Sequence, residues 1–146
     1  MTVKQKTTTL SSAQHLRNSG LRPSQQRLAV FNYLCDHKTH PTVDMVYHEL
    51  LPIYPTLSRT TVYQTLEALC ENGLALKLTI EENVMRFDAD TSGHGHFLCT
   101  GCGNVFDFFY SEKTSFPKPN AGFVVEQTHL YQKGRCPKCS VKKVRN

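Results

Sequence analysis

The first 35 residues of this 146-residue chain contain no acidic side chain. The first carboxylate is Asp36, although the whole chain carries 12 Asp and Glu residues against 17 Lys and Arg residues. A positively charged end can face the phosphates of a nucleic acid, and Arg22 and Arg27 are the candidate contacts there. A solvated basic tail that binds nothing would have the same composition.

Long apolar runs are also missing. No window approaches the 18 or more apolar residues of a membrane-spanning helix, and the N-terminus lacks the apolar core of a signal peptide. We therefore expect a cytoplasmic protein without a membrane partner. The length and the 39% hydrophobic content suffice for one ordinary domain or two small ones.

The first 88 residues have the pattern of helices followed by a β-hairpin. Behind a short helix ending near Gly20, apolar residues recur at helical spacing in three segments, and Gly73 ends the last of them. The three helices are predicted to begin at Ser24, near Thr42 and at Ser58, and strands are predicted at 74–80 and 84–87. This order is typical of a winged helix-turn-helix, whose third helix enters the DNA major groove.

Polar side chains of the third predicted helix lie off its apolar stripe, near the N-terminal end where groove contacts are made. The candidate DNA contacts are Arg59, Thr60, Tyr63 and Gln64. An ordinary solvated helix surface is the alternative, and the predicted topology together with the basic N-terminus favours DNA.

The polar, turn-rich residues 89–93 are the predicted hinge between a DNA-binding domain at 1–88 and a second domain at 94–146. Strand-like runs at 96–99, 104–110 and 123–131 predict little helix in the second domain. The predicted fold class is therefore α+β, with an N-terminal winged helix and a small α/β dimerisation domain.

Cysteine is distributed unevenly, and four of the six form two C-x-x-C pairs. These four are Cys99, Cys102, Cys136 and Cys139. In a chain without secretory features such pairs favour a closed tetrahedral zinc site, which stabilises the fold, over a redox disulfide. Cys35 and Cys70 stand alone in apolar helical patterns and are predicted to be small core residues.

A second metal site is indicated around His94 and His96. Residues at i and i+2 of a strand lie on one face, so both imidazoles can reach one ion, and Asp88 and Asp107 are near in sequence. Mixed nitrogen and oxygen ligands suit Fe²⁺, Mn²⁺ or Zn²⁺. A pair of surface histidines without a ligand is the alternative.

These residues resemble those of the ferric uptake regulator (Fur) superfamily of metal-dependent transcriptional repressors. The matching segments are His40-Pro41-Thr42, 58–63, Arg86-Phe87-Asp88, 94–103, Asp107 and Cys136-Pro-x-Cys139. Within the superfamily the chain is most similar to the peroxide-stress repressors, because Asp88 and Asp107 stand where iron sensors usually carry glutamate.

The resemblance implies a homodimer that binds a palindromic operator in double-stranded DNA. It also implies that His40, Asp88, His94, His96 and Asp107 hold a regulatory Fe²⁺ or Mn²⁺ ion. In the peroxide-sensing branch, iron-catalysed oxidation of His40 or His94 would then release the ion and the operator.

Two other functions fit the sequence. One is an iron- or zinc-responsive repressor of metal uptake. The other is a small iron or manganese enzyme, which the winged-helix pattern and the lack of a further acid/base constellation disfavour. We therefore predict a regulator and not an enzyme.

Overall fold

The computed structural model describes residues 10–141. The chain divides into two compact units, the first made of Met1–Leu78 with Met85–Thr91 and the second of Thr79–Val84 with Ser92–Asn146. In the described range, no helix is both long enough and apolar enough to cross a lipid bilayer. The two units are described in turn, and the predicted domain boundaries around 89–93 stay a prediction.

The helices of the first unit each begin behind a hydroxyl side chain. The oxygens of Ser11, Ser24, Thr42 and Ser58 each accept a hydrogen bond from the backbone N–H three residues further on, which satisfies a donor with no partner inside the helix. The helices are α1 (Ser12–Asn18), α2 (Gln25–Asp36), α3 (Val43–Leu50) and α4 (Arg59–Glu71). The predicted helix starts are confirmed.

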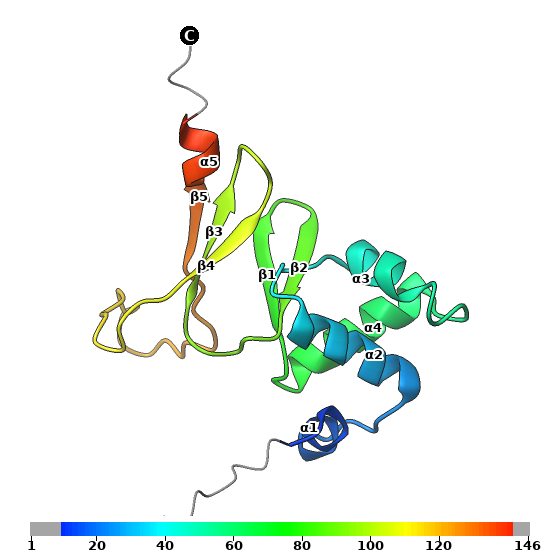
Figure 1. The fold of residues 1–146 in the computed structure, drawn as a ribbon. Helices are drawn as coiled ribbons and strands as arrows, with labels where there is room; N and C mark the ends of the chain where they lie inside the picture. The colour runs from blue at the N-terminus through cyan, green and yellow to red at the C-terminus, as the bar shows by residue number, and fades with distance from the viewer. Residues whose placement is uncertain (1–9, 142–146) are drawn as a thin grey trace, which may run out of the picture. The chain divides into compact units, whose positions relative to one another are not determined.

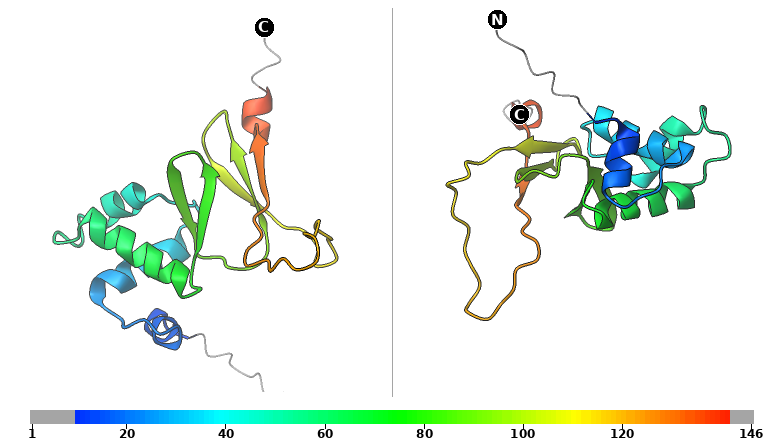
Figure 2. Two further views of the ribbon diagram at one scale, coloured as in Figure 1. Left: turned by 180° about the vertical axis from the view of Figure 1, so that it is seen from behind. Right: turned by 90° about the horizontal axis from the view of Figure 1, so that it is seen from below.

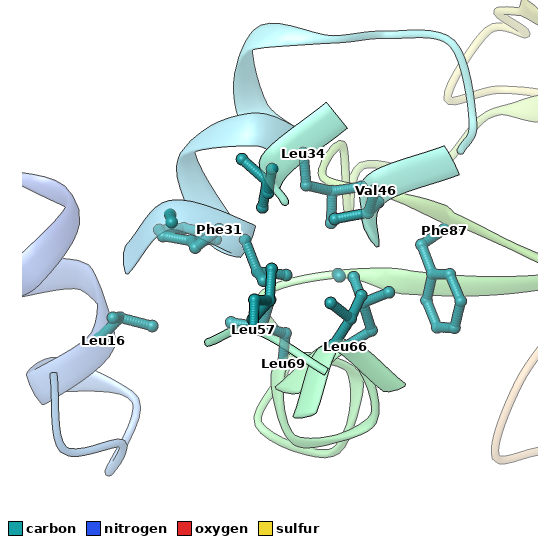
Figure 3. Packing of buried hydrophobic residues seen from close by; sticks show 13 residues of the cluster. Leu16, Phe31, Leu34, Val46, Leu57, Leu66, Leu69 and Phe87 are labelled. Atoms are coloured by element: carbon teal, nitrogen blue, oxygen red, sulfur yellow. The ribbon is translucent and has the colours of Figure 1, made fainter. Parts of the chain in front are cut away.

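A single apolar cluster holds these helices together (Figure 3). Leu34 of α2, Val46 of α3 and Leu66 of α4 are almost fully buried in it, and Phe87 reaches it from the hairpin. Burying one such side chain contributes about 1.5–3 kcal/mol relative to leaving it exposed. The first unit therefore has a hydrophobic core of its own.

The hairpin that follows α4 consists of β1 (Leu76–Glu81) and β2 (Val84–Asp88), which form a two-stranded sheet. Asn83 in its turn has a φ of 59°, a left-handed conformation that asparagine tolerates better than most residues. Three helices and a hairpin in this order are a winged helix-turn-helix, as predicted.

The second unit contains a three-stranded sheet in the order β4-β3-β5 (Figure 1). Its strands are β3 (Gly95–Cys99), β4 (Val105–Phe108) and β5 (Tyr131–Gly134), and a single turn of helix, α5 (Pro137–Ser140), follows β5. β3 pairs antiparallel with β4 and parallel with β5. In the β3–β4 ladder His96 lies opposite Asp107, so the register brings two predicted ligands together.

The strand predicted at 123–131 is wrong, because the structure begins β5 only at Tyr131. Residues 109–130 have no helix or strand, and Figure 2 shows them as a long loop between β4 and β5. Pro117 and Pro119 lack the N–H that a strand ladder needs, and Val124 remains 87% exposed. An apolar run without a partner strand does not form a sheet by itself.

The prediction for the isolated cysteines is wrong for Cys35. Its side chain is exposed at the end of α2, whereas Cys70 on α4 is half-buried. The helical period places Cys35 directly after the buried Leu34, at the edge of the apolar stripe.

Candidate metal sites and DNA-contacting helix

The two C-x-x-C pairs meet at one end of the three-stranded sheet. Cys99 ends β3 and Cys102 lies in the turn after it, while Cys136 and Cys139 belong to the start of α5. The four sulfur atoms all lie within 4.8 Å of one another, and the Cys102 and Cys136 sulfurs are 4.0 Å apart. Zn–S bonds of about 2.3 Å place tetrahedral sulfurs roughly 3.8 Å apart. The four thiols therefore fit one zinc ion.

Local backbone geometry brings these sulfurs together. A Cβ on Gly101 would lie 2.8 Å from Cβ and 2.9 Å from Sγ of Cys139, so the first turn passes the second pair too closely for any side chain. The N–H of Cys136 donates a hydrogen bond of 3.2 Å to Sγ of Cys99. Gly103 adopts a φ of 72°, which closes the turn after Cys102.

The protonation of this cluster is uneven. Hydrogen bonding to the backbone N–H of Cys136 lowers the pKa of the Cys99 thiol to about 6. Hydrogen bonds to the neighbouring sulfurs, first of all that of Cys136, raise the pKa of Cys139 to about 12. The cluster thus favours the thiolate of Cys99 and disfavours that of Cys139, and a bound divalent cation would favour the thiolate ligands that zinc requires.

A separate group of histidine and aspartate side chains lies on the same sheet. Nε2 of His94 and Nε2 of His96 are each 3.4 Å from Oδ1 of Asp107, and the two imidazole centroids are 4.5 Å apart. Nδ1 of His94 lies 2.9 Å from the Ser92 carbonyl oxygen. Since a carbonyl only accepts, this nitrogen carries the proton, and Nε2 directs either a lone pair or a second proton at the carboxylate. A metal ion can replace that second proton.

In the first unit, His40 and Asp88 form a second histidine–aspartate pair. Both side chains are buried, and Nε2 of His40 lies 3.4 Å from Oδ2 of Asp88. The backbone holds them in place: the Phe87 N–H donates to the Pro41 carbonyl at 3.1 Å, and Nη1 of Arg86 donates to the His40 carbonyl at 3.2 Å. Two segments more than 40 residues apart thus present one nitrogen and one carboxylate ligand side by side.

The structure places four predicted DNA contacts, Arg59, Thr60, Tyr63 and Gln64, on the exposed side of α4. Arg22 is also exposed. Arg27 differs, because its Nη1 donates to the Arg22 carbonyl at 2.7 Å and so stabilises the turn before α2. Sequence reasoning missed that α3 holds the Arg59 side chain, with Oδ1 of Asp44 at 2.6 Å from its Nε.

Comparison with known proteins agrees with this fold and these clusters. Residues 18–133 match the ferric uptake regulator family. The chain belongs to this family. Among its relatives is the peroxide operon regulator of Bacillus subtilis, 37% identical over 130 residues that cover 87% of this chain and 90% of the relative. The peroxide-responsive repressor PerR of Staphylococcus aureus is 34% identical and covers 87% and 88% of the two chains.

A solved structure of the family gives the same result for the fold. The peroxide stress regulator of Campylobacter jejuni superposes with a TM-score of 0.61 at 27% identity, covering 86% of this chain and 93% of that one. The predicted family membership and the predicted fold class are confirmed.

Proposed function

We propose that this chain is a metal-dependent, DNA-binding transcriptional repressor that responds to hydrogen peroxide. The observation that carries the proposal is the pair of histidine–aspartate clusters, His40 with Asp88 and His94 and His96 with Asp107. Two relatives support the proposal: the Bacillus subtilis protein is a peroxide operon regulator, and the Staphylococcus aureus protein is a peroxide-responsive repressor.

The four cysteines would hold a structural Zn²⁺ ion. A site in which all four ligands are thiolates leaves no open coordination position, so it stabilises the fold and performs no chemistry. Cys99, Cys102, Cys136 and Cys139 would thus fasten the turn after β3 to α5.

The regulatory ion would take ligands from both units. The first unit offers one imidazole and one carboxylate, and the second offers two imidazoles and one carboxylate. Neither set alone fills the coordination sphere of Fe²⁺ or Mn²⁺, whereas together they supply five ligands of the nitrogen and oxygen type that these ions accept. We propose residues 89–93 as the hinge between the two sets. Ligands on both sides of a hinge would couple metal binding to the orientation of α4 and hence to DNA affinity.

Bound Fe²⁺ would catalyse the oxidation of a ligand imidazole by hydrogen peroxide, in which one peroxide oxygen is added to the ring and the other leaves as water. His40 and His94 are the proposed targets, each able to gain one oxygen atom on its imidazole ring. The oxidised ring is a poorer ligand, so the two ligand sets would separate and the operator would be released. Asp88 and Asp107 would hold the ion without being consumed.

DNA binding would use two copies of the chain. Each copy would present α4 to one half-site of a palindromic operator, and half-sites of dimeric helix-turn-helix proteins lie about 34 Å, one DNA turn, apart.

The experiment compares the Fe²⁺ and Mn²⁺ forms in a DNA-binding titration before and after peroxide. We expect both forms to bind DNA, only the Fe²⁺ form to release it, and the released protein to carry an added oxygen of 16 Da on His40 or His94. Met45 is 40% and Met85 42% exposed, and peroxide can add oxygen to either thioether, so the titration is run in a background that carries Met45→Leu and Met85→Leu. If the Fe²⁺ form keeps its DNA and its histidines stay unmodified, the chain is a metal-responsive repressor and does not sense peroxide.

A further inference from the structure

Arg59 is the first residue of α4, and three side chains of α3 hold its guanidinium group. Nε donates to Oδ1 of Asp44 at 2.6 Å, and Nη2 donates to Nε2 of His48 at 3.2 Å. The Tyr47 ring covers one face of the guanidinium, with Cζ 4.5 Å from the ring centroid. All four residues lie in the first unit. An arginine that is 56% exposed is therefore fixed in orientation before any partner binds.

The hydrogen bonds to α3 involve one of the two donor edges of the Arg59 guanidinium. Nε–H and one Nη2–H point along the side edge, which Asp44 and His48 occupy. The end edge carries one N–H of Nη1 and the second N–H of Nη2, parallel to each other. Among residues 10–141, none accepts a hydrogen bond from Nη1 of Arg59. Two parallel donors are thus presented at the N-terminal end of the recognition helix.

We propose that Arg59 reads a guanine base in the major groove, and that Asp44, Tyr47 and His48 are its positioning residues. O6 and N7 of guanine are two adjacent acceptors that match the end edge of a guanidinium, and this pairing is the commonest specific contact between arginine and DNA. The N-terminal residues of a recognition helix are those that meet base edges. The inference deepens the proposed repressor function and rests on it.

A DNA phosphate is the other partner that a guanidinium could take. The Asp44 carboxylate, 2.6 Å from Nε, argues against it, because its negative charge repels a phosphate and offsets the charge of Arg59. The O6–N7 edge of guanine carries no formal charge, so the Asp44 carboxylate repels it much less than a phosphate. The arrangement favours reading a base over neutralising the DNA backbone.

The test uses the full-length Mn²⁺-loaded protein and a pool of random DNA duplexes. Duplexes are selected for binding, and each guanine of the best duplex is then replaced in turn. For the unmodified protein we expect one guanine in each half-site whose replacement weakens binding roughly 5- to 150-fold. Arg59→Ala removes both donors, so it should lower that discrimination to about 2-fold or less.

Two variants on α3 separate positioning from charge. Asp44→Ala removes the carboxylate that orients Arg59 and should reduce the guanine discrimination several-fold. Glu49→Ala removes an equally charged, exposed carboxylate from the same helix and should leave the discrimination unchanged. Thermal melts check that α3 stays folded in both. Equal discrimination in the two α3 variants would overturn the positioning role.

The remaining outcomes separate this inference from the repressor function. If Arg59→Ala weakens binding equally on all duplexes and lowers the salt dependence by about one phosphate contact, Arg59 binds a phosphate and the guanine assignment is wrong. If a selected duplex tolerates replacement of every guanine, the assignment is wrong as well. If no duplex is selected in the presence of Mn²⁺, the repressor proposal fails, and the inference fails with it.

Discussion

Replacing Cys136 by serine should unfold the second unit and leave the first unit folded. The first unit has a cluster of 13 buried apolar residues. In the described part of the second unit, only Ile80, Leu98, Cys99, Val105 and Cys136 are buried apolar residues. Two of these five are proposed zinc ligands, so bound zinc would supply the folding stability that such a small core lacks.

The size of the effect follows from the size of the unit. About 60 residues at roughly 0.05–0.15 kcal/mol each give a stability on the order of 3–9 kcal/mol. Structural zinc in small peptides contributes about 10–16 kcal/mol near neutral pH. Losing even a quarter of that, ~2.5–4 kcal/mol, removes a large part of the stability of this unit. The serine hydroxyl does not replace it, because it stays protonated and is a poor zinc ligand.

Amide hydrogen exchange resolved by peptide is the suitable assay, since the chain has no tryptophan to report on folding. In the Cys136→Ser variant, peptides from β3, β4 and β5 should lose protection, while those from α2 and α4 keep it, and the zinc content should fall from about one per chain. Cys35→Ser is the matched control, because Cys35 is exposed on α2 of the first unit and is not one of the four clustered cysteines. Unchanged protection of β3 in the Cys136→Ser variant would refute a structural role for zinc.

Three further predictions concern the other sites. His40→Asn should abolish Mn²⁺-activated DNA binding in a titration while bound zinc stays constant. Asparagine is chosen because it tolerates the φ of 52° at this position, where alanine would add strain of about 1 kcal/mol. Gly95→Ala should cost ~1–3 kcal/mol in a thermal melt and weaken Mn²⁺ binding, because its Cβ would lie 2.3–2.8 Å from three atoms of the Phe108 ring. Burial raises the pKa of Cys70 to about 11, so at pH 8 only roughly one thiol in a thousand is ionised and peptide mapping should show very slow alkylation there. This folded-state pKa is raised above the unfolded value near ~8.5, so the unfolded chain loses the Cys70 proton first as pH rises. The free energy of unfolding should therefore fall above that pH. A melting temperature independent of pH between 8 and 10 would contradict this.

The winged helix could be predicted because its signals are local. Ser24, Thr42 and Ser58 each mark a helix start through a hydrogen bond that spans three residues, and the apolar period behind each defines the buried face. The cysteine cluster could be predicted for a similar reason. A C-x-x-C turn brings two sulfurs together by itself, so only the meeting of the two pairs needed the fold.

Features that depend on contacts distant in sequence could not be predicted. The run 123–131 has strand-like composition, but a strand also needs a neighbour, and β3 is paired instead with β5, which begins at Tyr131. The ligand pair of His40 and Asp88 joins a loop to the end of β2 across nearly 50 residues. Asp88 could be proposed from its closeness in sequence to His94 and His96, whereas His40 came from family resemblance alone, since nothing near either residue indicates the other.

Arg59 shows how the two kinds of information combine. Its place at the start of α4 is local information and predicts contact with DNA, but the same position would suit a phosphate or a base. The choice between them depends on which guanidinium edge is available, and that is set by Asp44, 15 residues earlier on another helix. An acidic residue beside an arginine therefore changes the expected partner of that arginine from a DNA phosphate to a base. The acid offsets the positive charge that attracts a phosphate, but it leaves in place the N–H donors that a base requires.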